Sequence, residues 1–296
     1  SGYYYLGSAY AGVNRPQLAR KAFLLALDMP DWTYSIGMNV ADYFESRGDP
    51  NQAVEIYQRL FLKFPGEKAE TAQKMAKALA KQKKYRETIN IFTGLIEADP
   101  KTANPLAYYV GVSYYTLNDL VQAEAYFQKA INADFRDPDL YLKQGELSVR
   151  KGQWQAGLDL LNNGLKLGGI IYTPEASAYK YIGQAYAKLD DSKSAADNFR
   201  KALQAGNKET DVYLQFAANA SLNRDFRGVL EMLEPGAAAA ANVKNAEYQY
   251  YLGSAYDNLN MTRQAIQYYQ KALEAGYTNA AMVRARINEL QQNEEN

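Results

Sequence analysis

The sequence predicts an all-α fold, an α-solenoid built from antiparallel helix pairs. The first observation is the segment 108–130, YYVGVSYYTLNDLVQAEAYFQKA, which has the pattern of two amphipathic helices joined by a tight turn. In its second half, Ala123, Phe127 and Ala130 are spaced four and three apart and therefore share a helix face. In its first half, Gly111 is small where the two helices must approach closely. One such pair cannot bury its own apolar face, so neighbouring pairs must cover it.

The second observation is that this pattern recurs along the chain. Residues 4–10 and 250–256 share the string YYLGSAY, and each copy is followed by an Ala, aromatic, Ala series like that of the segment 108–130. A small residue occupies the position equivalent to Gly111, here called the glycine slot, in eight copies. The eight are Gly7, Ala41, Ala76, Gly111, Gly145, Gly183, Ala217 and Gly253. Because these positions follow one another at intervals of about 34 to 38 residues, they indicate a helical repeat array.

The domain organisation follows from this spacing. We expect residues 1–277 to form eight helix-turn-helix repeats and residues 278–296 to form a C-terminal capping helix with a polar tail. In that last helix, Met282, Ala285, Ile287 and Leu290 suggest an apolar stripe opposite a polar face. A terminal helix with one polar, solvent-facing side covers the exposed apolar surface at the end of a repeat array.

Three repeats depart from the pattern. In the fifth, Ser148 replaces the tyrosine of helix A while Gly157 and Gly164 replace the two alanines of helix B, and we expect looser packing there. In the seventh, Pro235 and the alanines at 237–241 predict a kinked or broken second helix, which makes it the weakest joint. Before the sixth, the segment 167–174 lengthens the interval and contains two adjacent isoleucines that need cover. This segment either tucks onto neighbouring helices or forms a partner-binding protrusion.

Composition excludes several classes of function. The 296 residues contain 33 Lys and Arg against 33 Asp and Glu, so the chain lacks the basic excess of a general nucleic-acid binder. It contains no Cys and no His, which removes thiolate nucleophiles, the usual zinc ligands and any histidine base. No phosphate-binding loop or calcium loop is present, and we expect no catalysis, no metal and no cofactor. The sequence contains no run of about 18 apolar residues, so it predicts no membrane-spanning helix.

The repeats resemble the tetratricopeptide repeat family. The family pattern is a large apolar residue, Gly and Tyr in the first helix, here called helix A, then Ala, Phe and Ala in the second, helix B. Leu6-Gly7-x-x-Tyr10 followed by Ala19, Phe23 and Ala26 matches it well. The resemblance covers nearly the whole chain. It implies a right-handed superhelix in which helix A lines a concave surface, with a protein or peptide segment of a partner lying in that groove.

The candidate partner-binding residues follow from helix geometry. We call the residue directly before the glycine slot the leucine slot. Positions two before, two after and five after the leucine slot should point away from helix B. In the fourth repeat these positions hold Tyr108, Val112 and Tyr115, an apolar stripe flanked by lysines of the third and sixth repeats. Exposed tyrosines are good anchors, although neighbouring repeats could also bury them. The full candidate set is Lys74, Lys77, Tyr108, Val112, Tyr115, Leu142, Glu146, Lys180, Gln184 and Lys188.

Two functions remain open at this point. The first is a non-catalytic protein–protein interaction scaffold, part of a multi-protein assembly in a bacterial envelope or periplasm. The alternative is a groove for an acidic polymer, a polysaccharide or nucleic acid, that uses the lysines. The Lys and Asn pairs with which some family members clamp a terminal carboxylate are absent. Ser1-Gly2 resembles the remnant of a cleaved tag, and we expect the chain to be an excerpt of a longer protein. The sequence does not determine the oligomeric state.

Overall fold

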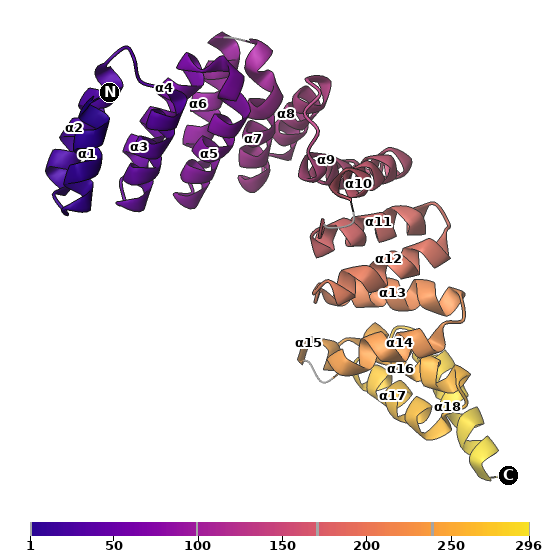
Figure 1. Cartoon of the computed structure of the whole chain (residues 1–296). Coiled ribbons are helices and arrows are strands. Elements are labelled where there is room, and N and C mark those ends of the chain that lie inside the picture. Colours follow the sequence, from indigo (N-terminus) through magenta and orange to yellow (C-terminus); the bar gives the residue numbers. More distant parts are fainter. Residues whose placement is uncertain (1, 99, 170–171, 238–239, 296) are drawn as a thin grey trace. The chain divides into compact units, whose positions relative to one another are not determined.

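The computed structural model describes residues 2–98, 100–169, 172–237 and 240–295, and within these ranges it contains helices and no strand. The chain divides into two compact units, residues 1–136 and 137–296. Figure 1 shows the helices of each unit following one another as hairpins. The first unit contains α1 (Gly2–Gly12), α2 (Pro16–Asp28), α3 (Tyr34–Ser46), α4 (Pro50–Lys63), α5 (Lys68–Lys81), α6 (Tyr85–Ala98), α7 (Ala103–Thr116) and α8 (Leu120–Asn132).

The second unit has the same succession of helix pairs with an interruption near residue 235. Its helices are α9 (Pro138–Arg150), α10 (Trp154–Gly168), α11 (Ala176–Lys188), α12 (Ser192–Gln204), α13 (Thr210–Leu222), α14 (Phe226–Leu233), α15 (Ala240–Val243), α16 (Ala246–Asn258), α17 (Thr262–Glu274) and α18 (Ala280–Glu295). Short 3-10 turns lie at Pro65–Glu67, Pro100–Thr102 and Glu234–Gly236. The all-α prediction is confirmed. The predicted boundary at residue 277, between the eight repeats and the C-terminal capping helix, stays a prediction.

The glycine slot holds each hairpin together. A Cβ atom at Gly7 or Gly111 would lie only 2.5 Å from a ring carbon of Phe23 or Phe127, the aromatic residue of the same repeat's helix B. Gly253 stands in the same relation to Tyr269. All eight residues of the slot are buried. The bulky residue of helix B therefore packs into the space left by the small residue of helix A, which is why a small residue recurs there.

The fifth repeat corrects one expectation. Its helices α9 and α10 do not pack loosely: a Cβ at Gly157 would lie 3.0 Å from the carbonyl oxygen of Gly145, and one at Gly164 would lie 2.9 Å from that of Pro138. The small residues thus let the two backbones come into contact instead of leaving a void. Helix spacing depends on the side chains at the contact, so the absence of bulk is compensated by closer approach.

A left-handed residue lies in every turn between helices A and B. The eight are Asn14, Gly48, Lys83, Asn118, Gly152, Asp190, Arg224 and Asn260, all with φ between 54° and 79°. In four repeats the next residue is an aspartate that caps helix B; the carboxylate of Asp119, for example, accepts from the backbone N–H of Gln122 at 3.2 Å. The left-handed residue ends helix A and the cap begins helix B, so the turn is set locally.

The seventh repeat has the predicted break. Helix α14 ends at Leu233, two residues before Pro235, which cannot donate a backbone hydrogen bond. The hydroxyl of the fully buried Tyr248 donates to the carbonyl oxygen of Leu233 at 2.6 Å. The Asn242 amide in turn donates to the carbonyl oxygen of Gly236 at 2.9 Å. Side chains from α15 and α16 therefore satisfy carbonyl groups that a continuous helix would have satisfied itself.

The segment before α11 is partly described. Ile170 and Ile171, whose cover was left open, lie outside the described residues. Tyr172 is half-buried, its ring meets the position of Gly168, and its hydroxyl donates to Asp139. Burial, with Asp139 beside it, raises the pKa of Tyr172 above its ordinary value. At Tyr172 the segment is thus tucked against its neighbours.

Helix α18 packs on α17 through a stripe that differs from the expected one. Val283, Ile287 and Leu290 are buried, whereas Met282 is 42% exposed and Ala285 is also exposed. The true stripe has spacings of four and three, which place its members on one face of a helix. Arg286 adds a two-pronged ion pair to Asp257 of α16, with both nitrogen–oxygen distances 2.8 Å.

Candidate functional site

The ten candidate residues are divided between the two units, which are considered separately. In the first unit, Lys77 is exposed and lies on α5, whereas Lys74 is engaged with Asp42 of α3 at 3.1 Å. Nearby, Lys81 pairs with Glu45 at 3.5 Å and Lys84 with Glu87 at 2.9 Å. Acidic side chains therefore partly neutralise the basic run of the third repeat, including Lys74.

Tyr108 and Tyr115 do not lie on the side away from helix B. Each is half-buried, and each ring centroid lies 6.4 Å from that of Phe127; Tyr108 is also 5.2 Å from Phe135. The reason is the spacing: Tyr108 and Tyr115 are three before and four after Gly111, so all three share one helix face. They flank the space into which Phe127 packs. Val112 is also half-buried.

The same arrangement recurs at both ends of the chain. The ring of Tyr4 lies 6.0 Å from Phe23, and that of Tyr250 lies 5.9 Å from Tyr269. Where helix B carries a tyrosine, the residue four after the glycine slot is acidic: Tyr269 donates to Asp257 at 3.1 Å, and Tyr57 donates to Glu45 at 2.9 Å. These positions therefore take part in the packing of the hairpin, and their use by a partner stays a prediction.

In the second unit, Leu142 and Glu146 of α9 are also buried, contrary to the expectation of an open face. A Cβ at Gly164 would lie 2.8 Å from the Leu142 side chain, so Leu142 fills the closest part of the α9–α10 contact. Glu146 is only 8% exposed and lies 3.4 Å from Arg150. Burial, together with the Glu146 carboxylate, raises the pKa of Tyr181 to about 12.

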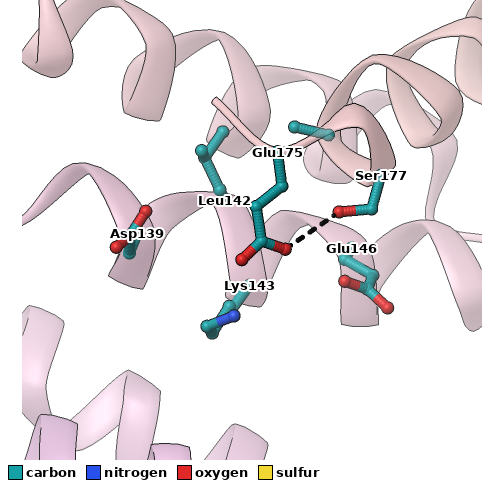
Figure 2. A pocket seen from close by; sticks show the side chains of 7 residues that line it. Asp139, Leu142, Lys143, Glu146, Glu175 and Ser177 are labelled. Carbon is teal, nitrogen blue, oxygen red and sulfur yellow. Dashed lines mark hydrogen bonds between the residues drawn. The ribbon is translucent and has the colours of Figure 1, made fainter. Parts of the chain in front are cut away.

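Glu146 and Leu142 border a small hollow between α9 and the start of α11. Figure 2 shows Glu175 and Ser177 on one side of it and Asp139, Lys143 and Glu146 on the other. The Ser177 hydroxyl donates to Glu175 at 3.4 Å. The enclosed space is about 20 Å³, room for about one water molecule. It is too small for a side chain of a partner.

A much larger cleft of about 510 Å³ lies across the helices A of the fifth, sixth and seventh repeats. We call it the α9–α11–α13 cleft. Two of the candidates, Gln184 and Lys188, line it, together with Val149, Ala187 and Ala218, which the same helix geometry had placed on that side. Lys180 lies outside the lining; it is half-buried and pairs with Glu209. Two of the ten candidate residues thus line one cleft of the second unit, and their role in binding stays a prediction.

Sequence reasoning missed four residues of this cleft, namely Arg150, Trp154, Gln215 and Asn219. Trp154 begins α10, and the Lys188 ammonium lies 6.0 Å from its ring centroid. Arg150 is four residues after Glu146, and Asn219 is four after Gln215, so each continues a face of its own helix. That spacing was a usable signal, but membership of the cleft depends on how three separate helices are placed.

The chemistry of the cleft is that of a binding surface. Its lining has two cations, three side-chain amides, one indole and three small or branched apolar residues. Among the described residues, no group of three or more His, Cys, Asp or Glu side chains could hold a metal ion. Within the same part of the chain, no helix combines the length and apolar character required to cross a membrane.

Helix pairs that recur along the chain, each with a bulky residue of helix B packed against a small residue of helix A, define a helical-repeat protein. Models described as tetratricopeptide repeat match residues 38–66, 74–139, 142–210 and 246–275, which together are more than half of the chain. The chain belongs to the tetratricopeptide repeat family. Proteins of this family generally mediate protein–protein interactions and are generally non-catalytic.

The chain is also similar to several solved structures, of which one shares its fold with a TM-score above 0.5. The crystal structure of YrrB, described as a tetratricopeptide repeat protein with an unusual peptide-binding site, has a TM-score of 0.54 at 19% identity and covers 67% of this chain and 97% of its own. A repeat protein from Parabacteroides merdae has a TM-score of 0.46 at 12% identity, covering 87% and 98% respectively. One from Cytophaga hutchinsonii has a TM-score of 0.48 at 18% identity, covering 83% and 98%. No curated protein matches the chain significantly.

Proposed function

We propose that this chain is a non-catalytic scaffold that binds an extended segment of a partner protein in the α9–α11–α13 cleft. The observation that carries the proposal is the cleft itself, about 510 Å³ in volume and formed by three successive helices A. A volume of several hundred Å³ suits a ligand of the size of a few amino-acid residues. The peptide-binding site for which the YrrB structure is described is consistent with such a use of this fold.

The cleft is suited to an extended chain because its lining alternates polar and apolar groups. Ala187 and Ala218 leave room for a backbone to approach, and Gln184 lines the cleft from the same helix as Ala187. Side-chain amides can bond to the N–H and C=O groups of any extended segment. Tyr108 and Tyr115, which we had expected to anchor a partner, are engaged with Phe127 and take no part in the proposal.

A cleft for an acidic polymer has less support. It depended on four lysines of the third and sixth repeats, of which Lys74 is paired with Asp42 and Lys180 with Glu209, so that Lys77 and Lys188 are left exposed. A salt titration separates the two functions, because polymer binding should weaken steeply with salt and peptide binding much less. Membership of a bacterial envelope assembly stays a prediction, to be checked by fractionation of the native host.

The experiment selects peptides from a random twelve-residue display library against the folded chain. Selected peptides should lose binding to Ala187→Trp, in which the indole fills the cleft. They should keep binding to Ala156→Trp, a matched change at an exposed position of α10 outside the cleft lining. Peptides that bind both variants equally, or a selection that enriches none, would exclude the cleft as the binding site. Melting curves confirm that both variants are folded.

A further inference from the structure

The α9–α11–α13 cleft is electrostatically one-sided. Its lining includes the guanidinium of Arg150 and the ammonium of Lys188 but no carboxylate. This differs from the chain as a whole, in which acidic and basic residues are equal in number. It also differs from the small hollow nearer the N-terminus of α9 on the same helix face, which Asp139, Glu146 and Glu175 border. The two cations therefore give the cleft lining a net positive charge, although the chain as a whole is neutral.

Arg150 and Lys188 line the cleft from equivalent positions of two adjacent helices. Each is five residues after the glycine slot of its own helix A, Gly145 in α9 and Gly183 in α11, and these two helices pack against each other. Equivalent positions of successive repeats are neighbours in a stacked array. Trp154, whose ring the Lys188 ammonium contacts, also lines the cleft.

Both cations keep most of their bonding capacity. The contact between Arg150 and Glu146 is a single one at 3.4 Å, and the Arg150 side chain is 43% exposed while that of Glu146 is 11% exposed. A guanidinium has five N–H donors in a planar fork, so one long contact leaves the others available. Lys188 is exposed, and among the described residues it has a ring contact with Trp154 and no ion pair.

Three other side chains of the lining offer hydrogen-bond acceptors. Asn219 donates from its amide to the backbone oxygen of Gln215 at 2.8 Å, and Gln215 donates to Asp211 at 2.5 Å. Within the described residues, neither amide oxygen accepts a hydrogen bond, and Gln184 makes none at all. These oxygens can accept the backbone N–H groups of an extended peptide.

We propose that the partner segment is acidic: Asp or Glu side chains within an extended stretch pair with Arg150 and Lys188, and the backbone beside them bonds to Gln184, Gln215 and Asn219. The proposal rests on the function proposed above and names the chemistry of the segment. A guanidinium binds a carboxylate through two parallel hydrogen bonds, and Lys188 adds a second charge. Because the cleft crosses three helices, it takes an internal segment and needs no chain terminus.

The test uses the display selection described above, in which peptides are fused at their C-termini and carry no terminal carboxylate. Peptides that depend on the cleft should be enriched in Asp and Glu. Cleft-dependent peptides without such enrichment would overturn the acidic segment and leave the proposed function standing. If no peptide depends on the cleft, the proposed function fails and the inference fails with it.

A second arm measures the contribution of the two cations. An enriched peptide, made synthetically with an acetylated and an amidated end, should bind Arg150→Gln with Lys188→Gln at least about tenfold more weakly than the parent chain. Arg227→Gln with Lys208→Gln removes two exposed cations of the same unit outside the cleft lining and should change the affinity less than about twofold. Equal losses in both double variants would overturn the assignment.

A third arm reverses the charge. Selection against Arg150→Glu with Lys188→Glu should enrich peptides rich in Lys and Arg. If the charge-reversed variant still selects acidic peptides, Arg150 and Lys188 do not determine which peptides bind. Melting curves of each variant are recorded first. If Arg150→Glu unfolds the chain through repulsion from Glu146, Lys188→Glu alone is selected against instead and should abolish the enrichment in Asp and Glu.

Discussion

The ring of Phe127 occupies the space that a side chain at Gly111 would need: a Cβ there would lie 2.5 Å from Cδ1 of the ring. Gly111→Ala should therefore force the α7–α8 pair apart and lower the free energy of unfolding by about 2 kcal/mol. Gly94→Ala, at an exposed helical position of α6 with no atom within 4 Å of the new Cβ, should raise it by about 0.5 kcal/mol. Urea unfolding measures both, and equal effects would contradict the packing described.

Tyr108 and Tyr115 flank Phe127, which makes them structural. Replacing both by alanine removes two half-buried rings from the α7–α8 contact and should lower the free energy of unfolding by about 3 kcal/mol or more. Replacing both by phenylalanine keeps the rings and should cost about 1 kcal/mol or less. An unchanged melting temperature in the alanine variant would return these rings to a partner-binding role.

Lys83 has a left-handed backbone conformation, with φ of 56°. A side chain is disfavoured there by about 1 kcal/mol, and glycine is not. Lys83→Gly should therefore stabilise the chain by about 0.5 kcal/mol despite the added freedom of the unfolded state. The control is Lys77→Gly, an exposed position inside α5, which should destabilise by about 1 kcal/mol. Thermal unfolding should show a higher melting temperature for Lys83→Gly and a lower one for Lys77→Gly, and a lower melting temperature for both would contradict the left-handed conformation of Lys83.

Several buried tyrosines make the chain sensitive to alkaline pH. Burial first, and then the Glu45 carboxylate for Tyr57 or the Asp257 carboxylate for Tyr269, raises their pKa above the ordinary 10.0. Burial also raises the pKa of Tyr248. A raised folded-state pKa contributes stability that is present below pH 10 and is lost as the pH rises toward the folded-state value.

The free energy of unfolding should thus change little between about pH 8 and 9 and fall above pH 10, by about 1.4 kcal/mol per pH unit for each such tyrosine. Urea unfolding as a function of pH measures this fall, and Tyr57→Phe should make it shallower. Tyrosinate absorbance reports the same groups directly. Titration of all 26 tyrosines near pH 10 in the folded chain would contradict their burial.

Arg286 connects α18 to α16 through both oxygens of Asp257, which also accepts from Tyr269. Arg286→Gln should lower stability by about 1 kcal/mol, a modest value because the Arg286 side chain is 45% exposed. Hydrogen exchange of the α18 amides should become faster. Arg284→Gln, at an exposed position of the same helix, should leave exchange unchanged. Faster exchange in both variants would mean that helix propensity, and not the ion pair, holds α18.

The sequence alone determined the repeat, the helix pairs and the small residue at each glycine slot. These features depend on contacts between residues within about 34 positions of one another, so the period and the apolar spacing record them directly. It also predicted the break at Pro235, because the missing N–H is a property of one residue. For the cleft it supplied Gln184 and Lys188, which helix geometry placed on one side of α11.

Only the tertiary structure decided which side chains are free to bind. Tyr108, Leu142 and Glu146 are occupied by neighbours whose positions depend on how closely each pair of helices approaches. That distance is set jointly by several residues, as the backbone contact between Gly145 and Gly157 shows. Arg150 and Asn219 are far apart in the sequence and line one cleft because α9, α11 and α13 are stacked. Stacking arises from the fit of successive repeats, which no single repeat's pattern contains.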